Sequence, residues 1–311
     1  MDSDVKTVRK FKRWKKTDWQ LFSMASYGAV FLIVFAYVPM FGIILAFKDG
    51  DFELNILNAI TNASWTGFAS FKEFFSDDKF ISILTNTVVL NLLMVLINFP
   101  APIIFALLIN EVKHGKFKRV VQTIANFPYF LSWIVFGGII LSMINLNTGV
   151  FVDFINLIIG KRINFASAQY FWGTIILTSL IKGLGWASII YLAAIASIDP
   201  ELYEAARIDG ANRWHGCIYI TLPGIAPTIT LFFLLTLSGI LGNNFEQFYV
   251  FQNAINLSKS EVITTYVYKT GIAQRRYSYV TAVGLFNSVV AVILLAGSNF
   301  VSKKLTGRGV F

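Results

Sequence analysis

The residues with the greatest potential for covalent or metal chemistry are few and lie far apart. The 311-residue chain has one cysteine, Cys217, and two histidines, His114 and His215, in separate polar loops. A single cysteine excludes an internal disulfide and a multi-cysteine metal site. A membrane enzyme would need clustered acids, histidines or a nucleophile at one membrane face, and the sequence lacks that arrangement. We therefore expect no catalytic residue, no metal site and no cofactor bound by this chain.

Polar side chains inside apolar segments are the other candidates. Lys182 lies in such a segment, where a cation costs about 2.5–3.5 kcal/mol at the membrane centre, so it must face protein or water. Lys182 is either a pathway residue that hydrogen-bonds a polar solute or pairs with an acid, or a structural residue that donates to a carbonyl or asparagine of a neighbouring helix. The sequence leaves both interpretations open. Thr87, Asn91 and Asn98 recur at helical spacing. For this polar stripe we favour bonds between helices over contacts with a solute.

The composition indicates which elements must hold these side chains. The chain is 56% hydrophobic and 14% charged, whereas soluble domains carry about 25% charged residues. Its apolar blocks reach about 20 residues, enough to cross a bilayer, and they lack the polar faces that a soluble helical core would need. We predict an all-α polytopic membrane protein. Its six transmembrane helices are expected at about residues 21–47, 81–109, 120–144 (bent at Pro128), 170–197, 224–241 and 278–301.

The distribution of basic residues predicts the topology. The net charge is +9, and Lys and Arg are concentrated at particular membrane flanks. The positive-inside rule explains this pattern better than nucleic-acid binding does. An amino-terminal arm (1–20), the loops near 113–119 and at 198–223, and a tail (302–311) hold 16 of the 26 basic residues, and the opposite side holds 9. We therefore expect both termini and the 198–223 loop in the cytoplasm.

The loop before the fifth span carries regular helix signals. Asp199 can cap a helix whose first turn holds Pro200, and Gly210 is a natural left-handed stop. A second short helical piece is expected from Ala211 to Ile220, ending at Pro223. The sequence thus predicts a helix–turn–helix that faces water and is joined rigidly to two spanning helices.

The spacing within this loop resembles a family motif. Glu204-Ala205-Ala206 is followed after three residues by Gly210 and, after nine more, by Ile220-Thr221-Leu222-Pro223. Helix-favouring alanines and a helix-ending glycine explain each residue alone but not the combined spacing. The stretch resembles the cytoplasmic EAA loop of permease subunits of binding-protein-dependent ATP-binding-cassette importers, and the whole chain resembles their oligo- and polysaccharide branch. The residues that this resemblance assigns to coupling with the ATPase are Glu204, Ala205, Ala206, Asp209, Gly210, Ala211, Ile220, Leu222 and Pro223.

The resemblance implies a type I importer permease in the bacterial cell membrane, surrounded by membrane lipid. Its expected partners are a second homologous permease in a heterodimer, two ATPase subunits, and an extracellular lipid-anchored or periplasmic sugar-binding protein; a sugar is the cargo. The chain has no G-x-x-x-x-G-K-[ST] phosphate loop, so ATP and Mg²⁺ are expected on the ATPase subunits and this chain is not expected to be an enzyme. The residues expected along the sugar pathway are Asn91, Lys182, Trp186, Tyr191, Asn243, Asn244 and Glu246.

The alternative function is that of a secondary transporter or channel for a polar solute. Such proteins often have charged residues in several helices, or broken helices at corresponding places in two halves. Here only Lys182 is clearly intramembrane, and no paired repeat is visible. The sequence therefore favours the ATP-driven importer.

Overall fold

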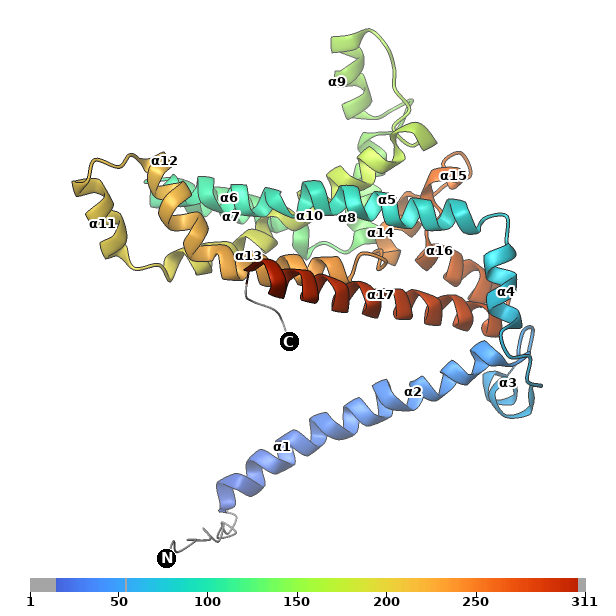
Figure 1. Ribbon diagram of the computed structural model, residues 1–311. Coiled ribbons are helices and arrows are strands. Elements are labelled where there is room, and N and C mark those ends of the chain that lie inside the picture. Colours follow the sequence, from blue (N-terminus) through green and yellow to red (C-terminus); the bar gives the residue numbers. More distant parts are fainter. Residues whose placement is uncertain (1–14, 54, 307–311) are drawn as a thin grey trace, which may run out of the picture.

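Long apolar helices dominate the structure, a computed structural model that describes residues 15–53 and 55–306 (Figure 1). Within these residues the chain forms helices and no β-strand. Five described helices are long and apolar enough to cross a membrane, and a pair bent by 105° makes a sixth span if it is counted as one. The all-α polytopic fold is therefore confirmed. The five spans are Lys16–Phe47, Phe80–Glu111, Ala168–Ala196, Arg213–Leu237 and Tyr277–Gly297, and the bent pair comprises α7 (Gly115–Asn126) with η3 (Phe127–Phe130), and α8 (Trp133–Met143).

A central bundle of spans packs around one long helix (Figure 1). That helix, α10, contacts both halves of the second span and also α13, which packs in turn on α17. Ile103, Tyr191 and Ile225 meet in one buried cluster that joins three of the spans. Because lipid is as apolar as these side chains, close packing rather than removal from water holds them together. The bundle helices are α5 (Phe80–Asn98), α6 (Pro100–Glu111), α10 (Ala168–Ala196), α13 (Leu222–Ser238) and α17 (Tyr277–Thr306).

Short helices occupy the segments between the predicted spans. In the segment at 145–169, Gly149 precedes an apolar helix and Gly160 (φ +71°) ends it. The loop at 242–277 likewise contains three helices and a π turn. The short elements of both regions and of the first long loop are α3 (Ile56–Asn62), α4 (Ala69–Ser76), α9 (Val150–Ile159), α14 (Phe245–Phe251), α15 (Leu257–Ser260), α16 (Ile263–Tyr268) and η5 (Lys269–Ala273).

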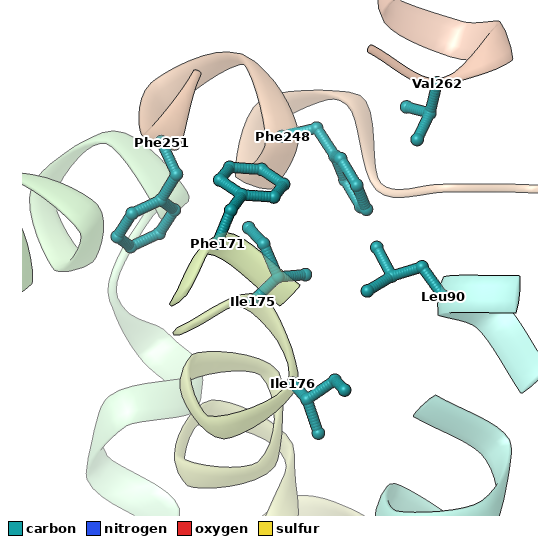
Figure 2. Close-up of a cluster of buried hydrophobic side chains, with 7 residues drawn as sticks. All are labelled: Leu90, Phe171, Ile175, Ile176, Phe248, Phe251 and Val262. Atoms are coloured by element: carbon teal, nitrogen blue, oxygen red, sulfur yellow. The ribbon is translucent and has the colours of Figure 1, made fainter. Parts of the chain in front are cut away.

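A second buried cluster attaches some of these short helices to the bundle. Figure 2 shows Phe171 of α10 pointing toward Phe248 and Phe251 of α14, with Leu90 of α5 facing the same space. Val262, directly before α16, completes the contact. The segment that follows α13 is therefore folded back against α10 and α5.

The first span diverges from the bundle (Figure 1). None of the residues of its longest part, α1, is buried within this chain. Its far end packs on α17 through η2. An apolar helix exposed on all sides is one that lipid or another protein surrounds. This span consists of α1 (Lys16–Leu32), η1 (Ile33–Tyr37), α2 (Val38–Met40) and η2 (Phe41–Phe47).

Helices extend into the segments predicted as the amino-terminal arm and the tail. Most of the predicted arm, residues 1–14, lies outside the described residues, and the described part from Lys16 already belongs to α1. The predicted tail from residue 302 begins inside a helix, because α17 continues to Thr306.

An ionic network closes the end of the bundle where the first long loop meets α17. Arg276 donates from Nε to Asp51 (3.2 Å) and from Nη2 to Glu73 (2.7 Å). The other carboxylate oxygen of Asp51 accepts the backbone N–H groups of Ser278 (2.7 Å) and Tyr279 (3.2 Å). A carboxylate at a helix N-terminus satisfies unpaired donors and complements the helix dipole. Asp51 thus fixes the start of α17 to a loop more than 200 residues away.

A carboxylate–tyrosine network lies beside it. Asp77 accepts from the hydroxyls of Tyr266 (2.6 Å) and Tyr279 (3.2 Å) and from the backbone N–H of Lys79 (2.8 Å). Burial raises the pKa of Asp77, but these hydrogen bonds and the charge of Lys79 outweigh it, so the pKa lies below its ordinary value of 3.8. Burial and the bond to Asp77 raise the pKa of Tyr266 to about 12.

Candidate functional site

The predicted first helix of the loop at 198–223 is present as α11 (Pro200–Ile208). Asp199 caps it by accepting a backbone N–H of its first turn at 3.0 Å, and Pro200 occupies the first helical position. Gly210 takes a φ of +82°, the left-handed conformation that ends a helix. These three signals read from the sequence are confirmed. Figure 1 shows α11 at the end of the molecule opposite α4.

The outer surface of α11 combines a carboxylate with small and apolar side chains. Glu204, Ala205 and Asp209 are exposed. Ile208 is 87% exposed and Leu202 53% exposed. Exposed large apolar residues around a charge, on a helix that stands clear of the bundle, are typical of surfaces that bind another protein. The sequence does not single out these two apolar residues, because the pattern of apolar and polar residues in a short helix does not reveal which face is exposed.

The predicted end of the second helical piece at Pro223 is wrong. A π turn, η4 (Cys217–Thr221), leads from α12 (Arg213–Gly216) directly into α13, and Pro223 sits inside the first turn of α13. In an α-helix a proline clashes with the carbonyl four residues earlier. A preceding π turn widens the helix at that point, so the proline is accommodated. The loop is therefore coupled to the fifth span by one continuous helix.

A cavity of about 830 Å³ lies between α11, the start of the fifth span and the end of α6. Arg213 reaches across it toward Glu111 of α6, at 3.9 Å. Both side chains are largely exposed, so the pair contributes little stability. Leu222, also predicted for coupling, packs on the bundle. The predicted coupling residues that line the cavity are Glu204, Ala206, Ala211 and Ile220.

A second cavity, of about 310 Å³, lies inside the bundle between α5, α6, α10 and α13. Two predicted pathway residues, Asn91 and Tyr191, line it. Asn98, Ser179 and Thr236 add polar groups to a mainly apolar wall, and no charged residue of the described chain contributes. A largely apolar cavity with a few polar groups is typical of small-molecule sites.

The three residues of the polar stripe have different environments. Thr87 accepts the backbone N–H of Ile263 at 3.0 Å, and Asn91 accepts from Asn243 at 3.0 Å. These are the bonds between segments that the sequence favours. Asn98 differs, because neither its amide nitrogen nor its amide oxygen has a hydrogen-bond partner in the described part of the chain, although both atoms are buried. Asn98 is therefore the polar group most available to a ligand in the cavity.

Lys182 and Trp186 face the break between η3 and α8. The Lys182 ammonium donates to the carbonyls of Pro128 and Tyr129, both at 3.0 Å, and to that of Leu131. Trp186 stacks on Tyr129 with ring centroids 4.4 Å apart and an interplanar angle of 3°. Neither residue lines the bundle cavity. Of the two interpretations left open for Lys182, the geometry supports the bond to carbonyls of a neighbouring segment.

The remaining pathway candidates lie on or beside α14. Asn244 caps this helix by accepting the backbone N–H of Gln247 at 3.0 Å, and Glu246 is exposed. Gln247, which the sequence does not single out, is buried and donates to the Ile175 carbonyl (2.9 Å) and the Thr178 hydroxyl (3.2 Å). No group of three or more metal-binding side chains lies together among the described residues.

The fold and site together define a polytopic membrane protein with a bundle cavity and a capped, exposed helix at one end, which is the general form of a transport subunit. Residues 84–307 match the family model described as "Binding-protein-dependent transport system inner membrane component". The chain belongs to this family.

Individual relatives cover nearly the whole chain. Protein LplB of Bacillus subtilis (strain 168) is 40% identical over 100% of this chain and 98% of its own length. The polygalacturonan/rhamnogalacturonan transport system permease protein YteP of the same organism is 38% identical over 94% of this chain and 90% of its own. A chain of a bacterial ABC transporter involved in import of the acidic polysaccharide alginate superposes with a TM-score of 0.85 at 36% identity, covering 94% of this chain and 97% of that one.

Proposed function

We propose that this chain is one of two permease subunits of an ATP-driven importer for oligo- or polysaccharides. The transport systems named for YteP and for the alginate transporter support a sugar cargo. The observation that carries the coupling role is α11, a capped, exposed helix at the end of the bundle that continues through one turn into a spanning helix.

In this proposal α11 and both termini lie in the cytoplasm, as the excess of Lys and Arg on that side indicates. Each of two ATPase subunits binds one such helix, and ATP and Mg²⁺ are held there. Closure of the ATPases pushes α11, and the continuous helix from α12 into α13 passes that force to the bundle. The chain itself hydrolyses nothing. A sugar-binding protein on the opposite side delivers the cargo, as in the alginate transporter that was solved with its sugar-bound periplasmic protein.

The bundle cavity supplies the sugar contacts of this chain. Asn98 and Asn91 offer amide groups to ring hydroxyls, and Tyr191 offers an aromatic surface. A volume of about 310 Å³ falls at the lower end of ligand pockets, which span roughly 300–1,000 Å³. The cavity therefore accommodates one part of an oligosaccharide at a time, and the second permease completes the pathway.

Substitution of the exposed coupling residues tests this function. In the complete importer, Glu204→Ala and Gly210→Ala are expected to insert normally and to reduce sugar uptake at least tenfold, a factor that corresponds to about 1.4 kcal/mol. The first substitution removes a charge that orients the partner. The second places an alanine at a φ of +82°, where an L side chain is strained. The sugar to be used is the one that binds the purified binding protein of the same system.

Glu201→Ala is the matched control, because Glu201 is an exposed acid on the same helix outside the motif. It should leave uptake unchanged. Full uptake with normal ATPase association in both the Glu204→Ala and Gly210→Ala variants would contradict the coupling role of α11.

A further inference from the structure

We propose that Tyr203 is a positioning residue that fastens α11 to the fifth span, so that the two move as one body. The inference rests on the proposed function and extends it to a residue outside the motif. Tyr203 directly precedes Glu204 but points in another direction: Glu204 is exposed, whereas Tyr203 is half-buried.

The attachment of α11 to the rest of the molecule is sparse. Only Tyr203 and Ala206 of this helix are shielded from solvent, and its seven other residues are exposed. Residues three apart share one face of a helix, so these two form its inner face. Ala206 has a single methyl group, and Tyr203 therefore provides the large contact between α11 and the bundle.

Two hydroxyl groups form a chain from α11 into the fifth span. The Tyr203 hydroxyl lies 2.9 Å from the hydroxyl of Thr221, which is only 3% exposed. Thr221 donates in turn to the backbone carbonyl of Gly216 at 3.3 Å. A hydroxyl has one proton, so Thr221 accepts the proton of Tyr203. The Tyr203 ring also packs beside Gly216. Its Cδ1 atom lies 3.8 Å from the position that a Cβ atom at residue 216 would occupy, which is van der Waals distance.

The bond reaches the point at which the helix departs from α-geometry. Thr221 is the last residue of the π turn η4, and Gly216 lies five residues before it, directly ahead of that turn. Single π turns occur often at functional sites. Without the bond, α11 would be linked to the span mainly by the turn at Gly210, and such a turn can bend when α11 is pushed. The Tyr203–Thr221 bond therefore converts a hinged connection into a stiff one.

A thiol-accessibility experiment on the complete importer tests this role without knowledge of the sugar. Cys217→Ser removes the only cysteine of the chain, and Asn98→Cys then places a reporter in the bundle cavity. The rate of its modification by a charged methanethiosulfonate reagent is measured with and without ATP–Mg²⁺. Tyr203→Phe, which keeps the ring, should reduce the ATP-dependent change in rate about fivefold, which corresponds to about 1 kcal/mol for one hydrogen bond. The ATPase rate should stay within twofold.

We call the Tyr203–Thr221 hydrogen bond that fastens α11 to the fifth span a brace. Companion variants distinguish this brace from a general structural role of the two residues. Thr221→Val should show the same loss, Thr221→Ser should retain the response, and the double variant of Tyr203→Phe with Thr221→Val should be no worse than either single change. Tyr219→Phe, an exposed tyrosine of the same π turn, is the matched control and should respond normally.

Several outcomes would overturn the proposal. A normal ATP response in Tyr203→Phe, additive losses in the double variant, or release of the ATPase subunits by Tyr203→Phe each exclude a brace. If Glu204→Ala abolishes the response while Tyr203→Phe retains it, the brace fails and the proposed function stands. If ATP–Mg²⁺ does not change the rate of thiol modification in the importer that carries only Cys217→Ser and Asn98→Cys, the proposed function fails.

Discussion

The ammonium group of Lys182 lies against three backbone carbonyls at the break between η3 and α8. The rings of Trp133 and Phe136 surround it, with centroids at 5.3 and 5.7 Å. Non-helical backbone at membrane depth is tolerated only where its polar groups find partners inside the protein. Lys182 provides those partners, and the break in turn provides the polar surroundings that a buried cation needs.

Replacing Lys182 by methionine should therefore destabilise the protein. Methionine keeps most of the apolar stem but removes charge-assisted hydrogen bonds, so we expect a loss of about 2–3 kcal/mol in the free energy of unfolding. Thermal unfolding of the purified importer in detergent measures it. Lys161→Met, at an exposed lysine outside the spans, is the control. An unchanged unfolding temperature together with a raised KM for the sugar would instead make Lys182 a pathway residue.

The sequence identifies Lys182 and Asn98 as unusual but does not reveal what each one faces. Both are polar residues in apolar helices, and helical spacing gives the face of a helix without identifying its neighbour. The distinction depends on contacts between segments about 50 residues apart for Lys182. For Asn98 it depends on the absence of such contacts in the described chain.

At the scale of elements, the long apolar runs are predictable because a bilayer imposes their length. Departures from regular α-helix within these runs are harder to predict. The 3-10 turn at Phe127–Phe130 contains the proline expected to bend the third span, yet the bend of 105° depends on how α10 holds the break. The π turn before Pro223 has no sequence signal comparable to a proline, and the predicted helix end there was wrong for that reason.

The packing of α10 against α7 supplies a prediction with an internal control. A Cβ at Gly185 would overlap the backbone of Ala125 and Asn126, which cannot yield as a side chain can. Gly185→Ala should therefore cost about 1–3 kcal/mol in stability. Gly183→Ala, two residues away with open space around it, should be neutral or stabilise the helix by up to about 1 kcal/mol. Equal unfolding temperatures for the two variants would contradict the close packing.

At the scale of the whole molecule, the loop with α11 and the network around Asp51 and Asp77 lie at opposite ends of the bundle. They differ in how far apart in the sequence their interacting residues are. The capping signals of α11 and the spacing of the motif lie within one loop and are visible in the sequence, whereas the Tyr203–Thr221 bond is not. The network at the other end joins Asp51, Glu73 and Asp77 to residues 189–228 positions later. Spacing alone cannot predict such contacts, and the acids there look like an ordinary solvated loop in the sequence.

The network around Asp77 should make the stability of the molecule dependent on pH. The pKa of Asp77 is lowered in the folded state, so its contribution is complete above the ordinary value of 3.8 and is lost as the pH falls through the lower, folded-state value. The carboxylate of Asp77 accepts hydrogen bonds with both oxygens, whereas the amide of Asp77→Asn has only one acceptor oxygen. At pH 7 we therefore expect the free energy of unfolding to fall by about 1.5–3 kcal/mol, the range for hydrogen bonds to charged groups. Because protonation removes the same charge, the difference in unfolding temperature between the native protein and Asp77→Asn should shrink between pH 5 and pH 3. Asp78→Asn, at the exposed neighbouring acid, should match the native protein throughout, and a difference for Asp77→Asn that stays constant down to pH 3 would show that its charge does not hold this end together.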